Sequence, residues 1–247
     1  MRITHLDRVR MERAHVLAWP ALNTANIDGW LWRSSGGGSQ RANSVSTVDF
    51  TGTDVEHAVR EVEARYHAIS AVTRFQTFDE TSPPGLKDVL QRRGYRHGEP
   101  TLTMFRHPQP GSEMPADVEI HDHPSEEWLG VYLDAITQNR RVVNVEIIRH
   151  IRAPHAFFAY RDGCAVVSTA LCVIGHGCAV IECVATSARA QRQGAANAVL
   201  QALTHWTGQQ GVDWIGLQVV RDNTAAVTLY QKQGFVAGAT NTFWVRP

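Results

Sequence analysis

The residues best suited to chemistry lie where an apolar segment passes into a helical pattern, in the stretch CVATSARAQRQGAANAVLQAL (residues 183–203). Gln191, Gly194 and Ala196 stand there in Q-x-x-G-x-A spacing. A helix that begins near Gln193 presents unpaired backbone N–H groups and the positive end of its dipole. Such a helix end is a ready site for a pyrophosphate, and the small side chains let an anion approach the main chain.

The charge pattern of this stretch supports an anion site. Arg189 and Arg192 add positive charge, and no acidic residue occurs between Ala185 and Gly211. The alternative is a plain connection between a strand and a helix, which would not need this pattern of charge. The stretch therefore predicts a phosphate cradle.

A second group of residues follows a short buried strand, WIGLQVV, and reads RDNTAAVTLYQKQGF (residues 221–235). Asn223 is placed to cap a helix that has Lys232 in its last turn and ends at Gly234. Upstream, AFFAYRDG, CAVVSTALCVIG and CAVIECVAT read as three successive strands. The two chemical groups are thus expected at the starts of two helices that flank one strand.

Together, ATSARAQRQGAANAVL and RDNTAAVTLYQKQGF resemble the GNAT superfamily of acyl-CoA-dependent N-acetyltransferases. The first block is similar to its [RQ]-x-x-G-x-[GA] acetyl-CoA motif, and the second to its Asn…Ala…Leu-Tyr…Gly-Phe motif. The resemblance covers roughly the last hundred residues well and the first half only in outline. It implies an α/β fold with a mostly antiparallel twisted sheet flanked by helices, and acetyl-CoA as cosubstrate.

The resemblance also implies roles for individual residues. The cradle that would hold acetyl-CoA is Gln191, Arg192, Gln193, Gly194, Ala195 and Ala196. The main chain that would pair with the pantetheine arm and donate an N–H to the thioester carbonyl is Cys183, Val184, Ala185 and Thr186. Asn223 is first a helix cap and second a cofactor contact.

Tyr230 is the candidate general acid. Attack of an amine on a thioester expels a thiolate, and a phenol at that sulfur can protonate it. The family pattern places a tyrosine at this position. The alternative is a core aromatic at helical spacing with Ala226, and because Leu229 already supplies an apolar residue we favour the catalytic role.

Glu182 is the candidate base. It lies in an otherwise apolar strand, where period two puts it on the face of Val180 and Val184, opposite Ile181 and Cys183. A carboxylate in such a place is either functional or paired with a cation. Both alternatives stay open, as does action through a water molecule.

The chain reads as two halves built on one plan. The stretch HPQPGSEMP marks a linker, which gives a first domain at residues 1–107, a linker at 108–115 and a catalytic domain at 116–247. In the first half, GWLWRSS and RANSVSTVDF read as a hairpin, Thr53 and Glu56 as a capping box for a helix, and VLQRRGY matches LYQKQGF. These matches indicate two tandem GNAT-like domains.

The first half is predicted to lack a cofactor site. Its loop before the helix is the acidic DFTGTDVE, whose carboxylates would repel phosphates, and Leu90 stands at the position of the tyrosine. The half is expected to pack against the second and to wall the acceptor cleft. Its substrate-side candidates are Arg41 and Asn43 in the stretch SSGGGSQRANSV (residues 34–45), for which a simple long hairpin turn is the alternative.

Composition excludes several classes of binding partner. Lysine and arginine number 24, as do aspartate and glutamate, so no charge bias indicates nucleic acid or an anionic membrane. None of the four cysteines forms a C-x-x-C pair, and no metal site is expected. The charged start lacks the apolar core of a signal peptide, from which a cytoplasmic location is expected. Oligomeric state is not readable.

The sequence thus predicts an N-acetyltransferase that moves the acetyl group of acetyl-CoA to a primary amine by direct attack, with a small molecule as the acceptor. Two alternatives are a non-catalytic acyl-CoA-binding sensor and an enzyme that acetylates a protein lysine or N-terminus. A nucleotide-binding protein ranks last because the sequence lacks G-x-x-x-x-G-K-[ST] and any strand followed by G-x-G-x-x-G.

Overall fold

The computed structural model describes residues 2–109 and 113–246, so part of the expected linker, residues 110–112, lies outside the described residues. The first half contains α1 (His5–Ala18), β1 (Asn23–Ile27), β2 (Trp30–Ser34), η1 (Arg41–Asn43), β3 (Val45–Ser46), α2 (Val55–Ala68), β4 (Arg74–Phe78), α3 (Leu86–Arg92), β5 (Arg96–His97) and β6 (Thr101–Arg106). The second half contains β7 (Val118–His121), α4 (Glu126–Asp134), α5 (Gln138–His150), β8 (His155–Asp162), β9 (Ala165–Gly175), β10 (Cys178–Thr186), η2 (Ala188–Ala190), α6 (Ala195–Thr207), β11 (Trp214–Val220), α7 (Thr224–Lys232) and β12 (Val236–Val245).

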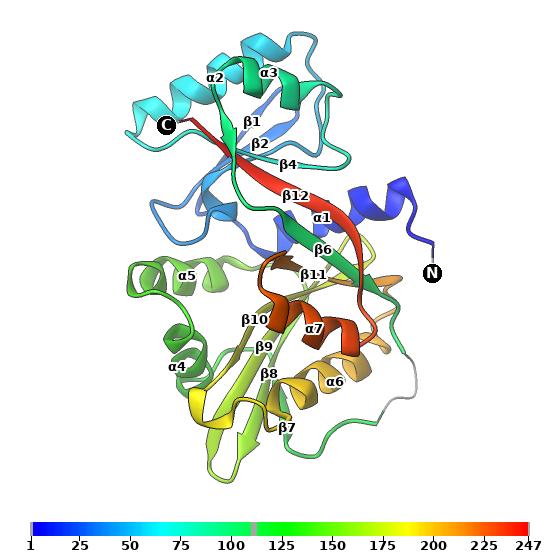
Figure 1. The fold of residues 1–247 in the computed structure, drawn as a ribbon. Helices are drawn as coiled ribbons and strands as arrows, with labels where there is room; N and C mark the ends of the chain where they lie inside the picture. Colours follow the sequence, from blue (N-terminus) through cyan, green and yellow to red (C-terminus); the bar gives the residue numbers. More distant parts are fainter. Residues whose placement is uncertain (1, 110–112, 247) are drawn as a thin grey trace.

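All the strands belong to one mixed sheet, which confirms the expected α/β class. Eleven strands follow the order β1-β2-β3-β4-β12-β6-β11-β10-β9-β8-β7, and β5 pairs with β12 off this path. The sheet runs the length of the molecule, with α2 and α3 at one end and α4 to α7 around the other (Figure 1).

The two halves exchange their last strands. β6 of the first half lies between β12 and β11, and β12 of the second half lies between β4 and β6 (Figure 1). Each half therefore completes the other's sheet, so neither could leave without breaking strand pairs. The division at residues 108–115 describes the order of the chain, whereas the sheet itself is continuous.

Helices cover both faces of the second half's strands. Helix α6 packs on one face, where Val199, Leu200 and Leu203 enter a core with Ile181 and Ile215. On the other face, α4 and α5 share a core with α1, although α1 comes from the first half of the chain. Helix α1 thus lies against strands of both halves.

The hydrophobic periodicity of the sequence does not predict two of the helices, α1 and α5. Helix α1 buries Glu12 and His15 among its apolar residues, and α5 buries Asn144 beside Ile147 and Ile148. Because polar residues interrupt the apolar stripe of each, periodicity does not indicate either helix. Both helices border the region described below as the candidate site.

Three expectations for the first half are wrong in detail. The segment RANSVSTVDF forms η1 and the two-residue β3 rather than a long strand, so its expected antiparallel pairing with GWLWRSS is limited to Leu31 and Ser46. A tight hairpin that was not expected joins β1 to β2. The cap of α2 is Asp54, whose side chain accepts a hydrogen bond from His57 N at 2.9 Å, and not Thr53. The cap thus lies one residue later than expected, and it accepts from the N–H one residue further along the helix.

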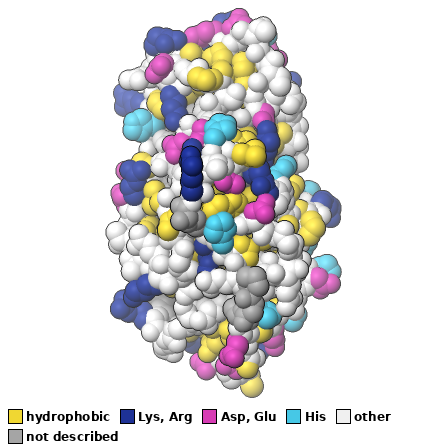
Figure 2. All heavy atoms as spheres, turned by 90° about the vertical axis from the view of Figure 1, so that its right-hand side faces the viewer, with side chains coloured by type: hydrophobic (Ala, Val, Ile, Leu, Met, Phe, Trp, Pro, Cys, Tyr) yellow, Lys and Arg dark blue, Asp and Glu magenta, His cyan; other side chains and the backbone are white. Residues whose placement is uncertain are grey.

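The surface carries mixed charge. On the face shown in Figure 2, basic and acidic side chains and histidines lie interspersed. Among residues 2–109 and 113–246, no helix has the length and apolar character needed to cross a membrane, and no group of histidine, cysteine and carboxylate side chains is arranged to hold a metal ion.

Candidate active site

Strands β10 and β11 run side by side only at their beginnings. Their parallel pairing covers Cys178 to Val180 against Trp214 to Gly216, after which β10 stays on β9 and β11 stays on β6. Among the described residues, the edge of β10 from Ile181 to Thr186 therefore has no strand partner on the side of β11. Its main-chain groups can pair with an extended ligand, in the manner of an added strand.

A β-bulge at this edge changes which way the side chains point. Glu182 pairs with Leu171 and Ala185 with Thr169, so two residues of β10 stand opposite one of β9. Cys183 takes a φ of 55°, which is uncommon for a residue other than glycine and is concentrated at functional sites.

The bulge corrects the expectation from period two. Glu182 does share a face with Val180, on the side of α1 and α4, and Cys183 joins them there. Val184, expected with Glu182, packs instead with the core of α6 on the opposite face. The extra residue reverses the alternation, which no alternating pattern in the sequence can predict.

The N-terminus of α6 is open. Gly194 is its N-cap with a φ of 90°, and no side chain caps the helix. Residues 191–194 are exposed, and no atom lies within 4 Å of the position that a Cβ on Gly194 would take. The helix begins at Ala195, two residues after the expected start. Its first N–H groups have no side-chain cap, and Arg189 and Arg192 lie nearby in the chain.

Glu182 is paired with a cation, which is one of the two alternatives that the sequence leaves open. Both its carboxylate oxygens accept hydrogen bonds of 2.6 Å from Arg41, which η1 of the first half supplies. Burial alone would raise the pKa of Glu182, but the charge and hydrogen bonds of Arg41, with a contribution from His15, lower it to about 2. A carboxylate with so low a pKa accepts a proton poorly at neutral pH.

Helix α1 supplies two neighbours of this ion pair that sequence reasoning missed. His15 Nδ1 lies 3.8 Å from Glu182 Oε1, and the Arg41 guanidinium lies 5.6 Å from the centroid of the Trp19 ring. Both ring nitrogens of His15 are buried and have no hydrogen-bond partner among the described residues. Helix α1 and its C-cap residue Trp19 therefore cover one side of the Arg41–Glu182 ion pair.

Tyr230 lies on α7, is 8% exposed and packs edge-on to Phe235. No residue that the structure describes makes a hydrogen bond with its hydroxyl. Burial, and then the negative charge of Glu182, raise the pKa of Tyr230 to about 12. The phenol is thus protonated at neutral pH. A protonated phenol in this position has a proton to donate.

Asn223 and Asn43 both have local structural partners. Asn223 Oδ1 accepts a hydrogen bond from Ala226 N at 3.2 Å and so caps α7. Asn43 donates to the carbonyls of Gly37 and Ser39 and accepts from Ser35 N. Its amide holds the glycine-rich loop that precedes η1, and this loop in turn positions Arg41.

A cleft of about 480 Å³ opens beside Arg41 and draws its walls from both halves. Its lining comprises Ser39, Gln40, Arg41, Gly98, Glu99, Thr101, Arg140, Gln218, Val220 and Phe243. The buried Nε of Arg140 has no hydrogen-bond partner among the residues described. Gln218 and Val220 bring the end of β11 to the cleft, beyond the residues of β11 that pair with β10.

In the first half, the residues that correspond to the α6 N-terminus and to Tyr230 already have partners within the fold. Asp54 caps α2, Asp49 pairs with Arg13, and Leu90 is fully buried in the core beneath α2 and α3. Strand β3 has only two residues, so it offers no free edge comparable to that of β10.

Comparisons with known proteins identify the family. Residues 7–242 match the family described as "Probable histone acetyltransferase Rv0428c C-terminal". The chain is 25% identical over 240 residues to "Uncharacterized N-acetyltransferase YobR" of Bacillus subtilis (strain 168), which covers 93% of this chain and 95% of that protein.

Solved structures show the same fold at low sequence identity. A GCN5-related N-acetyltransferase from Kribbella flavida is similar with a TM-score of 0.69 and 17% identity, over 97% of this chain and 95% of that one. A tandem GNAT protein from the clavulanic acid biosynthesis pathway has a TM-score of 0.61 and 11% identity, over 99% and 96% of the two chains.

Proposed function

Because the chain belongs to the family described as "Probable histone acetyltransferase Rv0428c C-terminal", and so to the GNAT acetyltransferases, we propose that it transfers the acetyl group of acetyl-CoA to the primary amine of a small molecule. One observation carries the proposal. The second half combines a β10 edge that β11 leaves unpaired beyond Val180, an α6 N-terminus without a side-chain cap, and a protonated phenol at Tyr230.

These elements suit the parts of acetyl-CoA. The N–H groups of Gln193 to Ala196 and the charges of Arg189 and Arg192 would hold the pyrophosphate. The main chain of Val184 to Thr186 would pair with the pantetheine arm. An N–H of the bulge at Cys183 would polarise the thioester carbonyl, where negative charge develops during attack.

The transfer is a direct one. The amine nitrogen forms a bond to the acetyl carbon, the carbon–sulfur bond breaks, and the thiolate leaves. Tyr230 gives its proton to the departing sulfur, and the proton of the attacking nitrogen passes to water in the cleft and returns the phenol to its neutral form. No covalent acyl-enzyme is formed.

Glu182 takes a modified role in this proposal. The sequence offers it as a base, but the contact with Arg41 lowers its pKa to about 2 and so weakens it as a proton acceptor. We propose that Glu182 instead positions Arg41, and with it the first half's loop, at the wall of the acceptor cleft.

The cleft favours a small acceptor over a basic protein tail. Its volume of about 480 Å³ is that of a small-molecule site. A protein lysine or N-terminus thus ranks second, although the family description speaks of histones.

The test is a screen of small amines and of a basic histone-tail peptide for acetyl-CoA-dependent release of free thiol. We expect turnover with at least one small amine and little with the peptide. Tyr230→Phe should remove the turnover while acetyl-CoA still binds. Binding of acetyl-CoA without turnover of any amine would instead favour the non-catalytic sensor.

A further inference from the structure

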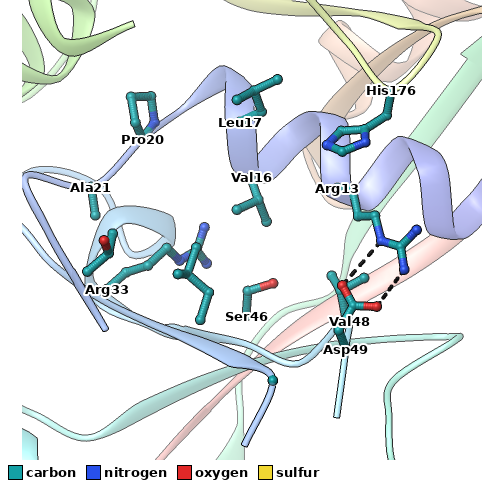
Figure 3. Close-up of a pocket in the computed structure, with 13 residues that line it drawn as sticks. Arg13, Val16, Leu17, Pro20, Ala21, Arg33, Ser46, Val48, Asp49 and His176 are labelled. Carbon is teal, nitrogen blue, oxygen red and sulfur yellow. Dashed lines mark hydrogen bonds and ion pairs between the residues drawn. The ribbon is translucent and has the colours of Figure 1, made fainter. Parts of the chain in front are cut away.

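A second hollow is lined mainly by residues of the first half, with His176 from the second half. It encloses about 490 Å³ between the last turns of α1 and the strands β2 and β3, and it shares no lining residue with the acceptor cleft. Most of its wall is apolar and consists of Val16, Leu17, Pro20, Ala21, Leu31 and Val48 (Figure 3). The volume and lining are those of a site for a small apolar molecule.

One charged side chain reaches the inside of this pocket. Arg33 extends from β2 into the space between Val16 and Ser46 (Figure 3), and only 1% of it is exposed. Its Nε donates to Ser44 O at 2.9 Å, and its Nη2 donates to Ser44 Oγ and to Gln76 Oε1. All these acceptors are neutral, and among the described residues Nη1 has no hydrogen bond.

Arg33 therefore carries a buried charge without a counter-ion. Gln76 donates onward to Asn241, Asn241 to Thr103, and Thr103 to Glu12, so the carboxylate at the end of this chain is separated from Arg33 by three neutral side chains. Burial lowers the pKa of Arg33 to about 10, and the group still stays charged at neutral pH. An unpaired buried charge is costly, by several kcal/mol in general.

The other end of the pocket is already neutral. Arg13 and Asp49 form an ion pair there, with Arg13 Nη2 lying 2.5 Å from Asp49 Oδ1, and both side chains are substantially exposed. This leaves a single positive charge, deep in an apolar space. A planar guanidinium with free N–H groups matches a carboxylate better than it matches other anions of one charge.

We propose that this pocket is a second binding site, for a small apolar monocarboxylate. The carboxylate would accept hydrogen bonds from Arg33, and the hydrocarbon body would lie against Val16, Leu17 and Leu31. The site is independent of acetyl-CoA and of the acyl transfer proposed above.

The test uses octanoate as the probe and 1-octanol as its uncharged match, each titrated calorimetrically into the full chain at neutral pH. Octanoate should bind at one site per chain, and octanol about tenfold or more weaker, because a hydrogen-bonded charge pair discriminates by that much. Arg33→Met should abolish the preference for octanoate.

A second variant keeps the proposal testable if Arg33→Met fails to fold. Val16→Trp fills the pocket, leaves Arg33 in place and should abolish octanoate binding. Leu6→Trp is the matched control, because Leu6 lies on α1 at 60% exposure and outside the pocket. Equal affinity for octanol, competition of octanoate with CoA, or undiminished binding by Val16→Trp would overturn the proposal.

Discussion

The helices α6 and α2 follow corresponding strands in the two halves, yet their N-termini differ in one decisive respect. The N-cap of α6 is an exposed glycine without a side chain to offer, which leaves the first N–H groups available. The N-cap of α2 is Asp54, whose carboxylate already accepts from His57 N. The same element order thus gives a potential anion site at the N-terminus of α6. At the N-terminus of α2, a side chain of the same loop already satisfies a backbone N–H.

The helices that follow show the same contrast. Tyr230 on α7 carries a phenol hydroxyl and is 8% exposed, whereas Leu90 on α3 is apolar and completely buried in the core. At these corresponding positions the second half leaves backbone and side-chain groups unsatisfied, whereas the first half satisfies them internally. The first half contributes packing, strands and Arg41 to the candidate active site.

The largest effect, on acetyl-CoA binding, is expected when the open N-terminus of α6 is given a negative charge like that at the N-terminus of α2. Gly194→Glu places a carboxylate at the uncapped N-terminus of α6 and should abolish acetyl-CoA binding, measured by calorimetry. Gly85→Glu is a matched control, because Gly85 is the N-cap of α3 with a φ of 87° and equally open surroundings. Loss of binding in both variants would mean that backbone strain, and not charge at α6, is the cause.

The comparison of Tyr230 with Leu90 predicts a loss of rate. Tyr230→Phe should lower kcat by about 100-fold, the usual contribution of a general acid, with CoA affinity unchanged. Tyr95→Phe, which removes a phenol of the first half, should leave kcat as it is. Because the pKa of Tyr230 is raised to about 12, its proton is retained between pH 8 and 10, and kcat should not fall there on its account. An unchanged kcat in Tyr230→Phe would remove Tyr230 from the mechanism.

The contact between the halves predicts a loss of stability. Arg41→Gln leaves Glu182 buried and unpaired and should lower the free energy of unfolding at pH 7 by about 3 kcal/mol. The folded pKa of Glu182 is about 2, below its usual 4.5, so the stabilisation is present above pH 4.5 and disappears as pH falls towards 2. The difference between wild type and variant, from urea titrations, should therefore shrink over that range.

An exposed ion pair of the first half provides the control for this prediction. Arg13→Gln breaks the pair with Asp49, whose side chains are 40% and 47% exposed, and should cost no more than about 1 kcal/mol. Equal losses in Arg13→Gln and Arg41→Gln would show that the enclosure of the Arg41–Glu182 pair carries no special weight.

The smallest effect is expected on stability, from substitution of Asp54 at the capped N-terminus of α2. Asp54→Ala should lower the melting temperature slightly through loss of the cap, and it should not create a second acetyl-CoA site. Thr53→Ala, at the neighbouring position that the sequence offers as a cap, should be neutral in thermal unfolding. A second bound acetyl-CoA in Asp54→Ala would show that capping alone closes the first half.

The sequence predicts the second half well because its signals are local. The strands β8 to β11, the helix α6 with Gly194 before it, and the helix α7 capped by Asn223 each follow from neighbouring residues. By contrast, α1 and α5 bury polar residues and give no clean stripe, and η1 is set by Asn43 holding the glycine loop. These three elements require knowledge of their tertiary partners.

The candidate site shows the same limit. Nothing local to Glu182 specifies its partner, because Arg41 is 141 residues away and arrives only after the halves have joined. The bulge at Cys183 and the exchange of β6 and β12 are likewise decided by pairing between distant segments. The sequence offers Arg41 and Glu182 as separate candidates, and the structure joins them.

The central claim is that one half alone carries the cofactor site, and calorimetric titration of the full chain with acetyl-CoA tests it most directly. The account predicts one molecule bound per chain, with binding lost in Gly194→Glu and kept in Gly85→Glu. Two molecules bound per chain, or one that survives Gly194→Glu, would contradict it.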